Sequence, residues 1–156
     1  MPARSGAPRQ VGLHRSLPAD ALDRGAWVTL PDGKRVWQLS IHSTGAAYVR
    51  IQFGGFAAGA GKVWVHNGVE ADGPYTGGGL YGNGEFWSGL VAGDNVTIEY
   101  EPAAQMKSTG QPPFHIRSLA HLTTQIAVPT PDPAAPCNLD VNCYADWLTS
   151  RNSVAE

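Results

Sequence analysis

The sequence predicts an all-β fold: an antiparallel, jelly-roll-type β-sandwich of seven or eight strands, with a disordered N-terminal lead-in and a Pro-rich C-terminal tail. Three observations support this prediction. Apolar and polar residues alternate with period two in several short segments, turn residues separate those segments, and no segment has a helical period. The 19 Gly and 12 Pro among 156 residues follow no fixed period, which agrees with many turns between short strands.

The first predicted element is a β-hairpin over residues 27–43. Its turn, Pro31-Asp32-Gly33-Lys34, contains the Asp-Gly pair that favours tight hairpin turns because both residues tolerate positive φ. In the second strand Trp37, Leu39 and Ile41 alternate with polar residues. We therefore expect these three side chains to face the core.

Two more strands are predicted over residues 48–53 and 62–67, where the alternation repeats. Between residues 68 and 84 the sequence has turn chemistry throughout and no apolar period, which predicts one or two surface loops. The residues of the two strands that are expected to share the inner faces are Val49, Ile51, Phe53, Val63 and Val65.

A second hairpin is predicted from residues 85–91 and 95–102, joined through Ala92-Gly93-Asp94. The last strand is expected over residues 113–122, where the alternation slips near Ser118 and so indicates a β-bulge. The inward residues expected in these segments are Val96, Ile98, Tyr100, Phe114 and Ile116.

The chain has room for one domain of ordinary size between two tails. We assign residues 1–24 to a flexible lead-in, residues 25–126 to the sandwich and residues 127–136 to a Pro-rich linker. The formal net charge is -2 and the basic residues are scattered, which argues against nucleic acid or an anionic membrane as a partner. No apolar run is long enough for a membrane helix, so no membrane span is predicted.

Several segments match the motifs of nucleotide-binding, catalytic or metal sites only in part. Gly77, Gly79 and Gly82 have the spacing of a dinucleotide-binding loop, but a strand follows where that loop needs a helix. The segment "GGFAAGAGK" lacks the first glycine and the Ser or Thr of a phosphate-binding loop. No catalytic triad is evident, and neither a cofactor nor a metal is predicted. The five histidines have no metal-ligand spacing: His14, His42, His66, His115 and His121.

Four aromatic residues, Trp64, Tyr75, Tyr81 and Trp87, are the candidate ligand-binding or docking residues, because exposed aromatics can stack on sugar rings or mark a docking face. Three acidic residues could line a calcium site, although their spacing favours ordinary roles in turns. These three are Glu70, Asp72 and Asp94.

The only two cysteines, Cys137 and Cys143, follow the proline run. Two cysteines are too few for a four-ligand metal site. They are reduced, paired with each other, or parts of disulfides with residues further along the chain, and a bridge closing so short a loop beyond a spacer would add little stability.

The heptapeptide "CNLDVNC" resembles the first residues of the catalytic domain in secreted bacterial trypsin-like serine endopeptidases of the lysyl endopeptidase type, which open with Cys-Asn-x-Asp-x-x-Cys. The preceding "GAWVTLPDGKRVWQLSIHSTGAAYVRIQF" is similar to the non-catalytic domain of the same precursors, as are "GEFWSGLVAGDNVTIEYEP" and "FHIRSLAHL". The resemblance covers about residues 11–126 and 137–156.

This resemblance implies that residues 137–156 are the truncated start of a protease domain, whose catalytic Ser, His and Asp lie beyond Glu156. Cys137 and Cys143 would then be half-cystines whose partners are absent from this chain. No Lys or Arg occurs between Arg117 and Arg151, so our hypothesis is that another protease separates the domains or that the sandwich stays attached.

The expected function is that of a non-catalytic pro- or accessory domain that assists folding, inhibition or docking of the protease. The expected partner is the protease domain in cis, and a polysaccharide or cell surface is a further candidate. The alternative is a carbohydrate-binding jelly-roll module of a secreted protein. A monomer is expected, and secretion follows from the resemblance alone, because the given sequence begins without the apolar run of a signal peptide.

Overall fold

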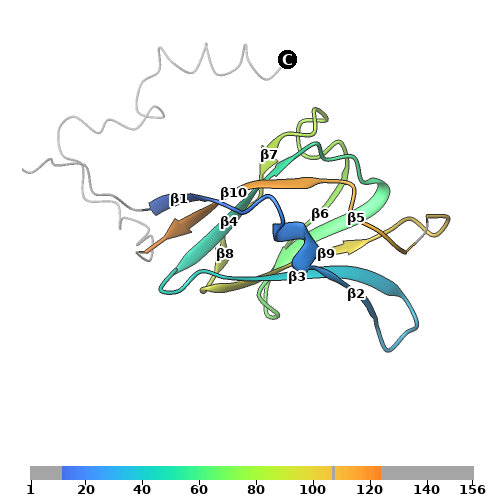
Figure 1. The fold of residues 1–156 in the computed structure, drawn as a ribbon, viewed down its shortest axis with the longest axis horizontal. Coiled ribbons are helices and arrows are strands. Elements are labelled where there is room, and N and C mark those ends of the chain that lie inside the picture. The colour runs from blue at the N-terminus through green and yellow to red at the C-terminus, as the bar shows by residue number, and fades with distance from the viewer. Residues whose placement is uncertain (1–11, 107, 124–156) are drawn as a thin grey trace, which may run out of the picture. The chain divides into compact units, whose positions relative to one another are not determined.

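The structure, a computed structural model, describes residues 12–106 and 108–123. These residues form an all-β sandwich of two antiparallel five-stranded sheets (Figure 1). Sheet A has the order β1 (Gly12–Ser16), β10 (His115–Leu122), β4 (Tyr48–Gly54) and β7 (Phe86–Trp87), with β8 (Val91–Ala92) also paired to β4. Sheet B has the order β2 (Ala26–Thr29), β3 (Arg35–His42), β9 (Asn95–Glu101), β5 (Gly59–His66) and β6 (Ala71–Gly77).

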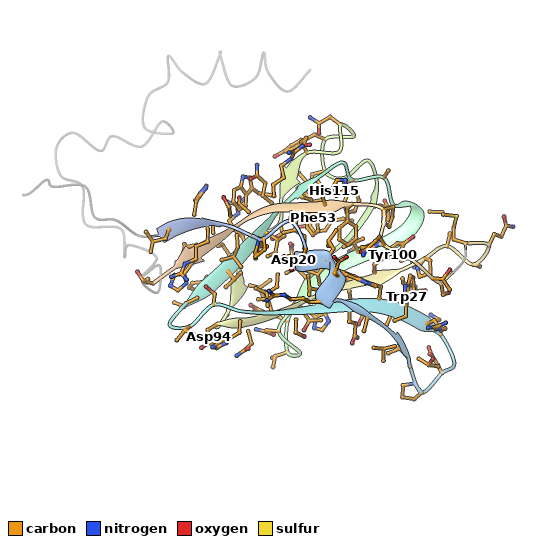
Figure 2. The ribbon with its side chains drawn as sticks, viewed as in Figure 1. Asp20, Trp27, Phe53, Asp94, Tyr100 and His115 are labelled. Atoms are coloured by element: carbon orange, nitrogen blue, oxygen red, sulfur yellow. The ribbon has the colours of Figure 1, made fainter. Side chains whose placement is uncertain are left out.

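The core lies between the inner faces of the two sheets and is rich in aromatic rings. Phe53 of β4 is fully buried, and Figure 2 shows it among the side chains between the sheets. Its ring centroid lies 5.1 Å from that of Phe86, 5.4 Å from that of Phe114 and 5.5 Å from that of Phe56. Aromatic pairs at these separations stabilise one another beyond the area that they bury. Phe53 therefore joins elements that are distant in the sequence.

The strands that alternate most regularly in the sequence are confirmed. The first predicted hairpin forms from β2 and β3, with Trp27 opposite Trp37. Its turn closes through a hydrogen bond in which the Leu30 N–H donates to the Lys34 carbonyl at 2.8 Å, and Gly33 adopts a φ of 85°. The slip in the last strand is also confirmed, because the register between β10 and β4 shifts between Ile116 and Ser118.

The assignment of the whole of residues 1–24 to a flexible lead-in is wrong for the described part of that segment. Gly12–Ser16 forms β1, which pairs with β10 along its full length, and a 3₁₀ helix, η1, spans Ala21–Arg24. Four of the five β1 side chains are exposed, so the strand has no apolar alternation that a sequence pattern could reveal. Its hydrogen-bonding partner lies about a hundred residues away.

The prediction of surface loops throughout residues 68–84 is wrong in its central part. β6 occupies Ala71–Gly77 and pairs with β5, although the register between them is irregular. Tyr75 is the only residue of β6 that is fully in the core, with 7% of its surface exposed. One apolar residue in a Gly-rich edge strand gives no detectable period, and this explains the error.

The second predicted hairpin is also wrong. β7 and β8 pair with β4 in sheet A, whereas β9 pairs with β3 and β5 in sheet B. The turn residues Ala92-Gly93-Asp94 therefore carry the chain from one sheet to the other. Gly93 has a φ of 94°, and its N–H donates to the Ala47 carbonyl at 2.7 Å. The described residues thus contain ten strands, two of them only two residues long, in place of seven or eight.

A hydrogen-bonded group that we call the Tyr75 clasp joins an edge of sheet B to sheet A. The Tyr75 hydroxyl donates to the Asp72 carboxylate, which also accepts the Gly89 N–H at 2.7 Å. The neighbouring Ser88 hydroxyl accepts the Ile51 N–H at 2.9 Å. A Cβ atom on Gly89 would lie 2.8 Å from an Asp72 carboxylate oxygen, so a larger residue there would displace the Asp72 side chain.

The predicted linker at residues 127–136 and the predicted protease start at residues 137–156 lie outside the described residues. Within the described part of the chain, no helix is long and apolar enough to cross a membrane.

Replacing Phe53 with alanine is expected to lower the free energy of unfolding by about 3 to 5 kcal/mol, because the change leaves a cavity among four aromatic rings. Urea denaturation followed by tryptophan fluorescence measures the change. The control is Tyr81→Ala, at a residue that is 75% exposed, and we expect a change within about 0.5 kcal/mol. Equal losses in both variants would contradict the central place of Phe53.

The Tyr75 clasp predicts a loss of stability at alkaline pH. Burial, and then the hydrogen bond to Asp72, raise the pKa of the Tyr75 hydroxyl above its ordinary value. Above pH ~10 the unfolded tyrosine releases its proton before the folded one does, so the free energy of unfolding falls by up to about 1.4 kcal/mol per pH unit. Urea denaturation at several pH values should show a shallower fall for Tyr75→Phe than for the wild type. A fall as steep in Tyr75→Phe as in the wild type would contradict the assignment, and Tyr81→Phe is the control.

Candidate binding face

The outer face of sheet A brings together three side chains from three different strands. On β4 the inward residues alternate with outward ones, so Arg50 and Gln52 point away from the core. The strand register places His14 of β1 and Arg50 in one row across the sheet, with Ala120 between them. Trp87 of β7 stands opposite Gln52 in the next row. We call this surface the His14–Arg50–Trp87 face.

The three side chains of this face contact one another. The guanidinium carbon of Arg50 lies 5.1 Å from the centroid of the Trp87 ring, a cation–π arrangement worth about 0.5 to 1 kcal/mol at an exposed site. The His14 ring centroid lies 5.0 Å from that of Trp87, with an interplanar angle of 57°. The Arg50 Nε–H donates to the Ser88 carbonyl at 3.1 Å. These contacts hold the guanidinium in place and do not use its two terminal amino groups.

Small residues form the floor of the His14–Arg50–Trp87 face. Ser118 and Ala120 of β10 point outward from the sheet, yet only 9% and 7% of their surfaces are exposed. The Ser118 hydroxyl donates to the Gln52 side-chain oxygen at 2.7 Å. Because the His14 and Trp87 rings meet although β10 and β4 lie between their strands, long side chains cover these small residues. The face is thus a packed surface in the free protein.

The charges are divided unequally between the two sheets. The strands of sheet A contain three arginines and no Asp or Glu. One of them, Arg117, forms a two-point ion pair with Glu85, with distances of 2.7 and 2.8 Å, and this pairing lowers the pKa of the Glu85 carboxyl. Among the described residues no carboxylate forms an ion pair with Arg50. Arg50 is the arginine at the centre of the face.

The outer face of sheet B differs because its polar side chains bind one another. The Gln38 side-chain amide donates to Glu99 at 2.7 Å, and the hydroxyls of Ser40 and Thr97 lie 3.1 Å apart. Three acidic residues lie on the strands of this sheet: Asp72, Glu99 and Glu101. Because Gln38 binds Glu99 and Ser40 binds Thr97, these side chains have less hydrogen-bonding capacity left for a ligand than the terminal amino groups of Arg50 have.

The four predicted binding aromatics do not form one site. Trp64 is half-buried on the outer face of sheet B, where it pairs in register with Glu99, and Tyr81 lies exposed in the loop between β6 and β7. Tyr75 is in the core, so its ring cannot meet a ligand in the folded domain. Trp87 alone among the four has a cationic side chain over its ring. A glycan site built from all four aromatics does not fit this arrangement.

The acidic residues that were weighed as calcium ligands bind groups of the protein itself. Glu70 accepts the Ala92 N–H at 2.6 Å, and Asp94 accepts a hydrogen bond from the Asn95 side chain at 2.8 Å. Asp72 belongs to the Tyr75 clasp. Across residues 12–106 and 108–123, no group of three His, Cys, Asp or Glu side chains is arranged to hold a metal ion.

A serine–histidine pair is present, but it is buried inside the domain and supports the fold. The Ser43 hydroxyl lies 2.7 Å from Nδ1 of His121, and both residues are buried. No side-chain carboxylate of the described residues binds His121 in a way that would complete a triad. The pair links the turn after β3 to β10 and is closed to substrate.

A cavity of about 410 Å³ lies beside Trp27 and Tyr100, which Figure 2 labels near each other. The Trp27 Nε1–H donates to the Gly110 carbonyl at 2.9 Å and so anchors the loop between β9 and β10. The lining contains no charged side chain, and its other members are Gln105, Met106, Thr109, Gln111 and Pro113. This cavity therefore offers no ionic recognition.

The sequence reasoning missed two residues of the His14–Arg50–Trp87 face. Arg50 alternates with the inward residues Val49 and Ile51 in the sequence, but no local pattern sets it apart from other outward residues. His14 was assigned to the lead-in. Its proximity to Trp87 arises from the pairing of β1 with β10 and of β10 with β4, which no local pattern encodes.

Cys137 and Cys143, the predicted half-cystines, lie outside the described residues. They remain a prediction.

Comparison with known proteins links the whole described domain to one family. The family model "Lysyl endopeptidase N-terminal domain" matches residues 1–123, which is most of the chain. Neither the curated proteins nor the solved structures include a significant match. The family model agrees with the resemblance found over residues 11–126 and does not extend to residues 137–156. The chain therefore belongs to the lysyl endopeptidase N-terminal domain family and contains the N-terminal domain of a protease precursor.

Proposed function

We propose that this domain assists the protease domain that follows it in the same secreted precursor, by docking against it and stabilising its folded state. The observation that carries the proposal is the His14–Arg50–Trp87 face, an ordered surface of an aromatic ring and an unpaired cation on a sandwich whose described residues contain no catalytic constellation. Such a domain is suited to binding and not to chemistry.

The ordered side chains of this face favour direct docking over a flexible covalent connection without contact between the domains. Arg50 and Trp87 hold each other in position, and the Ser88 carbonyl fixes the guanidinium. A surface that is ordered before binding loses little side-chain entropy when a partner arrives, so more of the contact energy contributes to affinity. A partner that binds only the folded protease stabilises it by mass action, and attachment in the same chain raises the effective concentration of that partner.

The experiment is a refolding assay in trans. The protease domain of the precursor is produced separately, unfolded, and diluted into buffer with or without an equimolar amount of this chain. We expect several-fold more active protease when the chain is present, measured by hydrolysis of a lysyl amide substrate. The Phe53→Ala variant is the matched control, because it keeps the His14–Arg50–Trp87 residues but weakens the core that positions them.

Two other outcomes have clear meanings. Equal recovery with and without the chain, together with no complex in size-exclusion chromatography, would reject the proposal. If the chain instead slows hydrolysis by protease that is already folded, its main role is inhibition, and docking is retained while assistance in folding is not.

A further inference from the structure

We infer that the protease domain docks on the His14–Arg50–Trp87 face and places a carboxylate group against Arg50. This inference rests on the proposed function and adds to it the surface and the chemistry of the partner. It identifies the outer face of sheet A, and neither sheet B nor the cavity beside Trp27, as the interface.

The chemistry of Arg50 points to a carboxylate. Arg50 is half-buried, and its guanidinium is held by the Trp87 ring and by one hydrogen bond from Nε to the Ser88 carbonyl. No acidic side chain of the described residues pairs with it, although Arg117 on the same sheet has such a partner in Glu85. The planar fork of an arginine matches a carboxylate in two-point geometry. The ordered Arg50 guanidinium is thus suited to bind a carboxylate of a partner.

The residues around Arg50 are those that dominate protein interfaces. Tryptophan and arginine are enriched among the residues that contribute most binding energy, and they act best where neighbouring groups exclude water. Trp87 covers a floor of buried small residues, Ser118 and Ala120, and His14 contacts the edge of this group. A partner surface laid on this face would complete the exclusion of water from the Arg50 guanidinium.

Charge complementarity favours the protease domain as the partner. The strands of sheet A contain three arginines and no acidic residue. Arg117 is paired with Glu85, and Arg50 is the cation of the face that has no acidic partner among the described residues. In residues 137–156, the predicted start of the protease domain, three acidic residues accompany one basic residue, Arg151. These acidic residues are Asp140, Asp146 and Glu156. Arg50 would attract an acidic surface of this kind.

The point at which the chain leaves the sandwich is consistent with this partner. The last described strand, β10, ends at Leu122 within sheet A, and it supplies the floor of the face. Ala120, in the row of Arg50, lies two positions before that end. The chain that leads toward the protease domain therefore begins beside the proposed interface.

The test measures binding of this chain to the separately produced protease domain, inactivated at its catalytic serine, by isothermal titration calorimetry. Arg50→Glu is compared with Arg35→Glu, a matched control, because Arg35 also lies over a tryptophan, with its guanidinium carbon 5.9 Å from the Trp27 centroid, but on sheet B. We expect Arg50→Glu to raise Kd about 30-fold or more and Arg35→Glu to change it less than about 3-fold. Wild-type Kd should also rise between about 50 and 500 mM NaCl.

A second variant protects the test against loss of the fold. Arg50→Lys keeps the charge but removes the planar fork, so we expect a Kd between those of the wild type and Arg50→Glu. Thermal unfolding of each variant shows whether the sandwich remains intact, and a variant counts only if its unfolding midpoint matches the wild type. If Arg50→Glu does not fold, the comparison between wild type and Arg50→Lys decides the outcome, and equal Kd values would overturn the inference.

The remaining outcomes separate the inference from the proposed function. If the wild type binds but Arg50→Glu and Arg35→Glu have equal effects, the inference is overturned and docking stands. If the wild type shows no binding, the proposed function itself fails. Polygalacturonate, a carboxylate-bearing glycan, is titrated in parallel. Binding to it that is lost in Arg50→Glu, without binding to the protease domain, would overturn the choice of partner and favour a carbohydrate-binding module.

Discussion

Burial of one face of β4 is the constraint on which the rest of this domain depends. Phe53 lies at the centre of the aromatic core, and it shares its face with two other fully buried residues, Val49 and Ile51. A slip of one residue in the pairing of β4 would turn these side chains to solvent and bring Arg50 and Gln52 into the core. The same constraint that builds the core therefore fixes the outward direction of Arg50, and the position of the His14–Arg50–Trp87 face is a consequence of the burial of the opposite face of β4.

The Tyr75 clasp links the buried core to the exposed His14–Arg50–Trp87 face. Ser88 and Gly89 follow Trp87 directly in the chain. The Ser88 carbonyl holds Arg50, its hydroxyl accepts the N–H of Ile51, and the Gly89 N–H is bound by Asp72 of β6. An edge of sheet B thus fixes the segment that positions Trp87 on sheet A. The His14–Arg50–Trp87 face is therefore part of the packing of both sheets and not a set of independent surface residues.

The fold was predictable where local chemistry is strong, and the candidate site was only partly so. The Asp-Gly turn and the alternation around Trp37 led to the correct hairpin, because turn type and strand period are encoded within a few residues. Tyr75 was misjudged because a single apolar residue among glycines has no period. The turn at Gly93 has the composition of a hairpin turn, yet it joins the two sheets. The strand before it, β8, pairs with β4, and the strand after it, β9, pairs with β3, so the two do not pair with each other.

The sequence by itself determined the all-β class, the inward residues of the regular strands, and the relationship to protease precursors, because these depend on local alternation, turn residues and short motifs. The tertiary structure alone decided which strands are neighbours. The contact of His14 with Trp87 and the absence of an acidic partner for Arg50 among the described residues both follow from pairings between segments far apart in the chain. Such pairings are selected by burial of the whole core, and that selection leaves no signature in any one stretch of residues.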